Sequence, residues 1–152
     1  MKKIIFVFVC LLVANYSNAQ VSDANYIVDY SKAIICGMDE ESFAELELDW
    51  YKDRPEITGG LIEGIMDKLG KTIPFKKSSR NTVKVTVISI TDNGKFNCNI
   101  ELFDSNGRLM AQARNIRCSK GGTWGSKLHL MKESTEKEGK KLGAALKKEI
   151  KK

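Results

Sequence analysis

A glycine-rich stretch and the chain's single histidine come closest to the residues of a reactive site. Residues 120–126 read Lys-Gly-Gly-Thr-Trp-Gly-Ser, and His129 follows them. Backbone N–H groups at a helix start can hold phosphate, and a histidine can act as a general base. The stretch lacks the GxxxxGK spacing of a phosphate-binding loop. We therefore expect a structural loop that Trp124 anchors to the core, and a histidine on a helix surface.

Three cysteines outside the leader described below could form one disulfide at most. They are Cys36, Cys98 and Cys118. Cys118 is the expected member of such a bond because it follows the last predicted strand, where geometry is adaptable. If Asn93-Gly94 and Asn106-Gly107 are both two-residue turns, Cys98 pairs with Ser89 and Asn115. This register favours Cys36 as the partner of Cys118 and leaves Cys98 as the alternative.

Neither a metal site nor a cofactor site is expected. The chain has no CxxC, its histidine is isolated, and the acids of residues 39–49 lack the DxDxDG spacing of a calcium loop. No catalytic constellation stands out, so we expect a protein that is not an enzyme.

The elements that would position these residues begin with two predicted strands and a helix. Residues 26–36 are apolar and β-branched, and residues 43–51 alternate apolar and polar side chains, so both segments predict strands. A helix is predicted from near Asp53, whose spacing to Glu56 fits a capping box, to a C-cap at Gly70. Gly60 and Gly64 lie one turn apart in this helix, which suggests close approach to a sheet.

Three further strands and a closing helix complete the predicted fold. Residues 82–91, 96–103 and 108–117 form an antiparallel meander, and Asn93-Gly94 suits a type I′ turn. Residues 127–152 form the last helix, with Leu146 in its buried stripe. The prediction is one α+β domain over residues 20–152: an antiparallel sheet, made of the meander plus an early strand or hairpin, with two helices packed on one face.

The first nineteen residues have the layout of a secretory signal peptide. Lys2 and Lys3 precede an uncharged apolar run, and Ser17-Asn18-Ala19 provides small residues for cleavage before Gln20. The run is too short to span a bilayer. We expect residues 1–19 to be removed after Ala19, and the remainder to be exported to the periplasm or the cell exterior without an integral membrane span.

Charge is distributed unevenly along the chain. The sequence has a formal net charge of +6, and loss of Lys2 and Lys3 with the leader lowers it by two. Residues 39–53 are strongly acidic, whereas residues 132–152 are rich in lysine. This mild excess does not indicate nucleic-acid binding. The possible interaction surface for an envelope protein or an anionic envelope polymer consists of Lys140, Lys141, Lys147, Lys148, Lys151 and Lys152.

Three segments carry a resemblance to a group of envelope proteins. They are the early strand with the helix of residues 57–69, the segment IELFDSNGRL of residues 100–109, and the closing LGAALKK of residues 142–148. With these segments the chain resembles the TolB amino-terminal, CsgG-like and LpoB-like group of periplasmic domains, closest to its uncharacterised members. The strand-like residues 43–51 and the GGTWG stretch depart from it. The group shares no active site, so the resemblance implies a fold and no catalytic residues.

Two functions follow as expectations. The favoured one is a non-enzymatic binding or assembly module of the cell envelope. The alternative is a small-ligand-binding protein or enzyme that uses the Gly121–Gly125 loop and His129. The sequence leaves the partner and the oligomeric state open.

Overall fold

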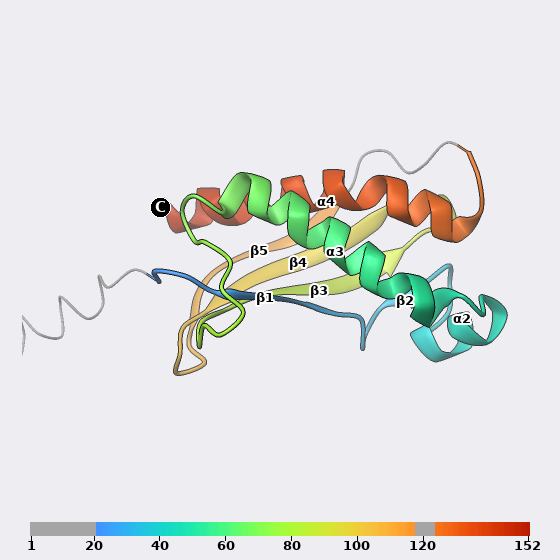
Figure 1. Ribbon diagram of the computed structural model, residues 1–152, viewed down its shortest axis with the longest axis horizontal. Coiled ribbons are helices and arrows are strands. Elements are labelled where there is room, and N and C mark those ends of the chain that lie inside the picture. The colour runs from blue at the N-terminus through green and yellow to red at the C-terminus, as the bar shows by residue number, and fades with distance from the viewer. Residues whose placement is uncertain (1–20, 118–123) are drawn as a thin grey trace, which may run out of the picture.

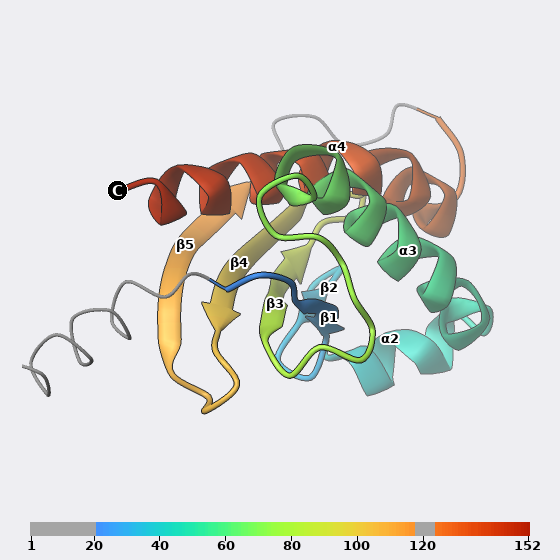
Figure 2. The same ribbon diagram turned by 60° about the vertical axis from the view of Figure 1, so that its left-hand side comes forward.

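A mixed sheet covered on one face by two long helices forms the framework of the molecule (Figure 1). The computed structural model describes residues 21–117 and 124–152. The elements are β1 (Asn25–Asp29), β2 (Ile34–Ile35), α2 (Glu40–Leu46), α3 (Trp50–Leu69), β3 (Thr82–Ile90), β4 (Phe96–Phe103), β5 (Leu109–Arg117) and α4 (Lys127–Ile150). Figure 2 shows α3 and α4 lying on the same side of the twisted sheet. The predicted α+β class is confirmed, and the prediction of two helices is corrected, because α2 is a third helix in addition to α3 and α4.

The sheet is mixed, which corrects the prediction of an antiparallel sheet. Strands β3, β4 and β5 form the expected antiparallel meander. Both β1 and β2 pair with β3 in parallel, with Asn25 opposite Thr82 and Ile34 opposite Ser89. Parallel neighbours need a long crossover, and α2 and α3 provide it here. The sequence prediction missed this because it interpreted α2 as a strand.

Residues 43–51 form helices and their connection, not a strand. The Asp39 side chain accepts a hydrogen bond from the Ser42 N–H at 2.7 Å, which caps α2. Of the apolar residues here, Phe43 of α2 and Trp50 at the start of α3 are buried, and their rings make an edge-to-face contact. Leu46 and Leu48, which created the apparent alternation, are exposed.

The other predicted early strand is divided in two. β1 ends at Asp29, whose carboxylate accepts the Ser31 N–H at 2.8 Å, and the Ala33 N–H donates to the Tyr30 carbonyl at 3.0 Å. This turn separates β1 from β2. The polar residues Asp29 and Ser31 therefore form a turn that ends β1 within the segment predicted as one strand.

Both hairpin turns of the meander contain three residues instead of the expected two. Gly94 and Gly107 each have a φ of 78°, whereas Asn93 is not left-handed. This is a type I turn followed by a left-handed glycine. A bulge at Asn115, whose φ is 55°, and another near Val87 shift the register further. Cys98 consequently faces Val87 and Ile116, not the predicted Ser89 and Asn115.

Helix α3 begins earlier than predicted, and its glycines face another helix. It starts at Trp50, and Asp53 and Glu56 both pair with Lys132 of α4 instead of forming a capping box. A Cβ added at Gly64 would lie 2.3 Å from the Glu136 carbonyl oxygen of α4. The close approach expected between this helix and a sheet is therefore an approach between α3 and α4.

The core lies between this helix pair and the sheet. Alternate residues of β3 and β4 point into it, including Val85 and Ile100, and α4 contributes Met131, Leu142 and Leu146. The opposite sheet face carries polar side chains such as Thr86 and Asn99, which are partly exposed. Among the described residues, no helix combines the length and apolar character that a membrane span requires.

Candidate functional site

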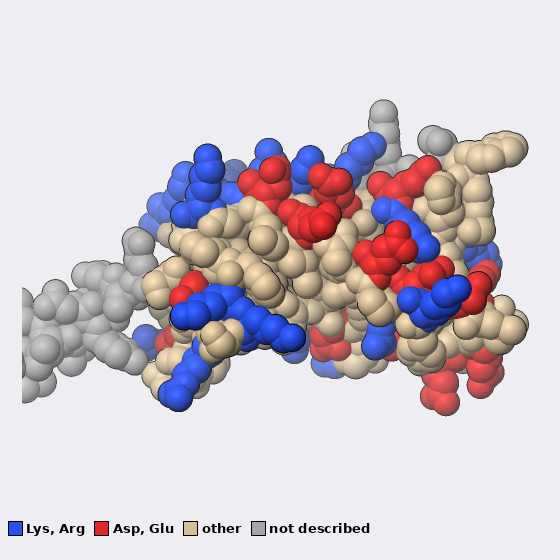
Figure 3. Space-filling model, viewed as in Figure 1, with Lys and Arg blue, Asp and Glu red and all other residues tan. Residues whose placement is uncertain are grey.

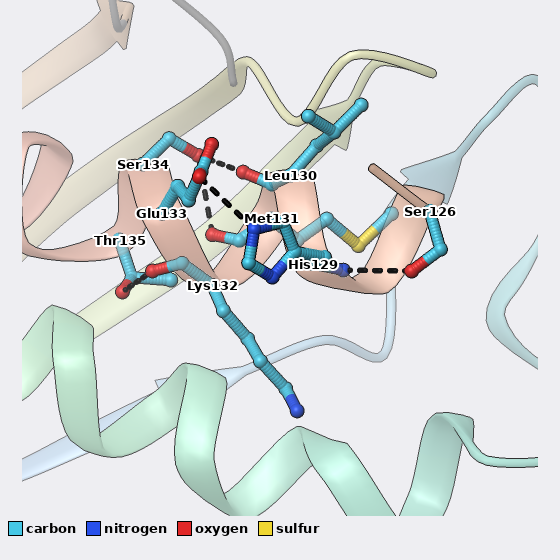
Figure 4. Close-up of polar contacts among 8 residues, drawn as sticks. All are labelled: Ser126, His129, Leu130, Met131, Lys132, Glu133, Ser134 and Thr135. Atoms are coloured by element: carbon cyan, nitrogen blue, oxygen red, sulfur yellow. Dashed lines mark hydrogen bonds and ion pairs between the residues drawn. The ribbon is translucent and has the colours of Figure 1, made fainter. Parts of the chain in front are cut away.

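His129 lies on the exposed surface of the first turn of α4, as the sequence predicts (Figure 4). Its backbone N–H donates to the Ser126 hydroxyl oxygen at 3.3 Å, which caps the helix. Its Nε2 lies 3.0 Å from Oε1 of Glu133, one turn along. The nearby Ser134 hydroxyl is buried and donates to the carbonyls of Gly94 and Leu130. In the part of the chain that the structure describes, no nucleophile is aimed at the imidazole.

The loop before α4 is only partly described. Gly121–Thr123 lie outside the described residues, so neither the predicted structural loop nor the alternative of a ligand site there is tested. Trp124 is described, and 85% of its surface is exposed. The prediction that Trp124 anchors this loop to the core is therefore wrong. Gly125, with a φ of 119°, lies directly against the His129 ring.

The cysteines lie in two different environments. Cys36 is a half-buried free thiol at the end of β2, and its pKa is raised to about 12, chiefly by burial and further by a hydrogen bond to Asp92. Cys98 is fully buried and points into the core from β4. Cys118 lies outside the described residues, so its pairing with Cys36 or Cys98 stays a prediction.

Half of the lysines proposed as an interaction surface are engaged within their own chain. Lys140 pairs with Glu136 at 3.3 Å, and Lys152 pairs with Glu149 at 3.0 Å. Lys141 donates its ammonium group to the Arg117 carbonyl, which ties α4 to β5. These lysines support the fold in addition to any role at the surface.

The other half converge on a hollow that we call the basic hollow. Its volume is about 390 Å³, and its lining residues are Lys68, Ala144, Lys147, Lys148 and Lys151. Lys68 comes from the end of α3, and the others come from the end of α4. Figure 3 shows Lys and Arg side chains gathered where α4 ends. Sequence analysis missed Lys68 because only the pairing of the two helices brings it to this site.

Helix termini explain part of this lysine cluster but not all of it. The C-terminus of a helix carries about half a negative charge, which favours lysines in its last turn. Two helix ends thus offset about one of the four positive charges. Asp67 lies 3.9 Å from the Lys68 ammonium group, but no acidic side chain lines the hollow. A net positive potential remains at the hollow.

A second, larger cavity lies between β1, α2 and α3. Its volume is about 620 Å³, and Tyr30, Glu40, Arg54 and Thr58 are among its lining residues. Arg54 pairs with Glu40 at 2.6 Å and lies 5.5 Å from the centre of the Tyr30 ring. The Trp50 indole N–H also donates to Glu40, at 3.0 Å. We call this the Tyr30 groove; its charged groups largely satisfy one another.

Burial controls the titration of Tyr30. It raises the pKa of the phenol to about 12, although the hydrogen bond with Thr58 at 2.8 Å acts in the opposite direction. A phenol that stays protonated at neutral pH can donate a hydrogen bond but cannot act as a base. Tyr30 therefore cannot serve as a base in this groove at neutral pH.

No external comparison supplies a function for either cavity. Across residues 21–117 and 124–152, no group of three or more His, Cys, Asp or Glu side chains could hold a metal ion. Comparison with protein-family models, with curated proteins and with solved structures finds no match. The function must therefore be argued from the geometry of this chain.

Proposed function

We propose that this chain is an exported, non-enzymatic binding or assembly module of the cell envelope that docks an anionic partner in the basic hollow. The observation that carries the proposal is the convergence of Lys68, Lys147, Lys148 and Lys151 on one cavity without an acidic lining residue. Ammonium groups on flexible stems bind carboxylates and phosphates as point charges. The predicted leader and the resemblance to periplasmic domains support the same function.

The environment of His129 also favours a binding module over an enzyme. A general base needs a nucleophile and an orienting group in contact with it. The described contacts of His129 are a helix cap and a hydrogen bond with the Glu133 carboxylate on an exposed helix surface. Both contacts serve helix stability.

Binding of the mature chain to two anionic probes tests the proposal. The probes are polyglutamate, which represents an acidic polymer or protein, and vesicles that contain phosphatidylglycerol. The test variant combines Lys147→Glu with Lys151→Glu. The matched control combines Lys76→Glu with Lys77→Glu, which makes the same charge change at two exposed residues that do not line the hollow.

Each outcome decides a part of the proposal. We expect the hollow variant to lose binding about tenfold or more at low salt, and the control variant to lose much less, because the interaction is electrostatic. Binding to polyglutamate alone indicates an acidic polymer or protein, and binding to vesicles alone indicates lipid headgroups. Equal losses in the two variants, or no binding to either probe, would contradict the proposal.

The Tyr30 groove supports a second candidate, the binding of a small ligand. Its volume of about 620 Å³ falls within the range of small-molecule sites. This candidate is distinct from the alternative that uses the Gly121–Gly125 loop and His129, which stays a prediction. A Cβ added at Gly59 would meet open space on this groove, so Gly59→Trp should fill it without disturbing the helix. A compound from a thermal-shift screen of sugars, amines and carboxylic acids that stabilises the native chain but not this variant would favour the second candidate.

A further inference from the structure

The connection between α2 and α3 presents an apolar surface with acidic neighbours. Leu46 is 72% exposed, Leu48 is 87% exposed and Tyr51 is 54% exposed. Glu45 and Asp49 beside them are also exposed. We call residues 45–51 the acidic knob. Large apolar side chains that are exposed together mark an interaction site more often than isolated ones do.

The acidic knob is held in a fixed shape. Phe43 and Trp50 on either side of it are buried, and their rings make an edge-to-face contact with centroids 5.3 Å apart. The Glu47 N–H donates to the Phe43 carbonyl at 2.8 Å, and the Trp50 N–H donates to the Glu47 carbonyl at 2.9 Å. Leu46 and Leu48 therefore project from an ordered corner, which lowers the entropic cost of binding.

The basic hollow carries the complementary charge and has room for an apolar side chain. Its volume of about 390 Å³ exceeds that of a leucine side chain, and its lining includes Ala144. Lysine stems are aliphatic and can cover an inserted apolar side chain while their ammonium groups reach outward. Those ammonium groups would face the carboxylates of Glu45 and Asp49.

The two surfaces cannot meet within one molecule. The acidic knob ends at the first turn of α3, and Lys68 lies in its last turn. Tyr51 and Lys68 are seventeen positions apart along the helix, a rise of about 26 Å. Figure 3 shows the acidic side chains of the α2 end and the basic side chains of the α4 end at opposite extremes of the molecule. Contact between them requires two copies.

We propose that the acidic knob of one copy inserts into the basic hollow of a second copy, which assembles the chain head to tail. The inference rests on the proposed function, since it makes a second copy the anionic partner of the hollow. Each added copy presents a new knob and a new hollow, so the contact is heterologous and can continue into a chain of molecules unless the rotation closes a ring. Because charge contributes to the contact, salt should weaken it.

Sedimentation velocity of the mature chain is the first test. At about 20 mM sodium chloride we expect the average mass to increase with protein concentration, and at about 500 mM we expect association to weaken tenfold or more. A monomer at every concentration and at both salt levels would overturn the inference.

Mixing two variants is the sharper test. The knob variant carries Glu45→Lys and Leu48→Ser, and the hollow variant carries Lys147→Glu and Lys151→Glu. Each variant alone should be monomeric, because each lacks one half of the contact. An equimolar mixture should form one-to-one dimers and nothing larger, because one intact knob and one intact hollow remain. Association of either variant alone, or no dimer in the mixture, would overturn the head-to-tail contact.

The same variants separate this inference from the proposed function. The knob variant should still bind polyglutamate, whereas the hollow variant should lose both polyglutamate binding and self-association. A wild-type chain that binds polyglutamate through its lysines but stays monomeric would overturn the inference and leave the proposed function standing. A monomer whose knob binds polylysine would assign the knob to a different basic partner, which also overturns the inference.

Discussion

At the scale of single residues, Cys36 illustrates how local environment controls reactivity. The residue has a left-handed φ of 51°, and its N–H donates to the Ile90 carbonyl at 2.8 Å, which fixes it beside β3. Burial, with help from the hydrogen bond to Asp92 and from that carboxylate's charge, raises the pKa of the thiol to about 12. The thiolate is the reactive form, so this environment protects the side chain.

We expect Cys36 to react slowly with a disulfide reagent such as DTNB at pH 8. A pKa of about 12 leaves on the order of one thiolate in ten thousand at that pH, against about one in ten for a thiol with the ordinary value of 9.0. Reaction should accelerate above pH 9, since ionisation increases as the pH approaches the pKa. Peptide mapping by mass spectrometry identifies the labelled cysteine.

Asp92→Asn provides the matched control for the thiol. This change removes the negative charge and weakens the acceptor while it leaves Cys36 buried. Labelling of Cys36 should become several-fold faster in the variant. Rapid labelling in the native chain would contradict a raised pKa of the Cys36 thiol. Equal labelling rates in the native chain and the variant would show that Asp92 does not contribute to that pKa.

Residue types in the sequence predicted the site only in part, for reasons visible in individual side chains. Lys147 and Lys151 could be predicted because lysines cluster on one helix. Lys68 is remote in sequence and joins them only through the packing of α3 on α4. The burial of Trp124 against the core was predicted wrongly because aromatic residues are usually buried, whereas this side chain is exposed.

At the scale of elements, glycines determine how α3 and α4 cross. Cβ atoms added at Gly64 and Gly139 would lie 2.3 Å and 2.2 Å from carbonyl oxygens of the opposite helix. These carbonyl oxygens belong to the backbone of a helix, so they cannot move aside as the end of a flexible side chain can. The helix-propensity cost of about 1 kcal/mol for each glycine is therefore offset by a closeness that no larger residue permits.

We expect Gly64→Ala to lower the free energy of unfolding by about 1–3 kcal/mol, because the helices must move apart. Gly59→Ala is the matched control in the same helix, since its Cβ would meet open space. It should raise the free energy of unfolding by about 0.5–1 kcal/mol through helix propensity alone. Urea denaturation measures both, and equal effects at the two sites would contradict the close crossing.

The contact of α4 with the sheet gives a second prediction at this scale. Leu146 is fully buried. Leu146→Asp places a carboxylate in the core, so we expect a loss of several kcal/mol, enough to unfold a marginal domain. Circular dichroism during heating would show a greatly lowered transition temperature. An unchanged transition would mean that α4 does not pack as described.

The elements also show where sequence patterns stop being informative. The three strands of the meander were predicted because their alternation is a local signal, whereas the turn lengths and the bulges that set the register were not predicted. The helices of residues 43–51 were not predicted, because the apparent period of two depended on Leu46 and Leu48. Both side chains are exposed, so their spacing carries no information about which face is buried. The parallel pairing of β1 with β3 could not be read locally, since it joins residues 57 positions apart, such as Asn25 and Thr82.

At the scale of the whole molecule, the beginning of the described chain is fastened to the segment between α3 and β3. Ala24 is fully buried, its N–H donates to the Pro74 carbonyl at 3.1 Å, and its carbonyl accepts the Lys76 N–H at 2.9 Å. The Asp23 carbonyl accepts the Asn81 side-chain amide at 3.0 Å. These contacts complete the edge of the sheet at β1, so residues 23–25 belong to the domain core rather than to a tail.

Two shortened chains test where the domain begins and whether the leader is separate from it. A chain that starts at Gln20, the expected product of leader removal, retains all of these contacts and should unfold at the same urea concentration as the full-length chain of residues 1–152. A chain that starts at Tyr26 loses the hydrogen bonds of residues 23–25, each worth about 1 kcal/mol, together with the buried Ala24. We expect its free energy of unfolding to fall by about 3 kcal/mol or more. Equal stability of the two shortened chains would contradict the start of the domain at residues 23–25. Mass spectrometry of the exported protein should find Gln20 at its N-terminus. A protein that retains residues 1–19 would contradict removal of the leader.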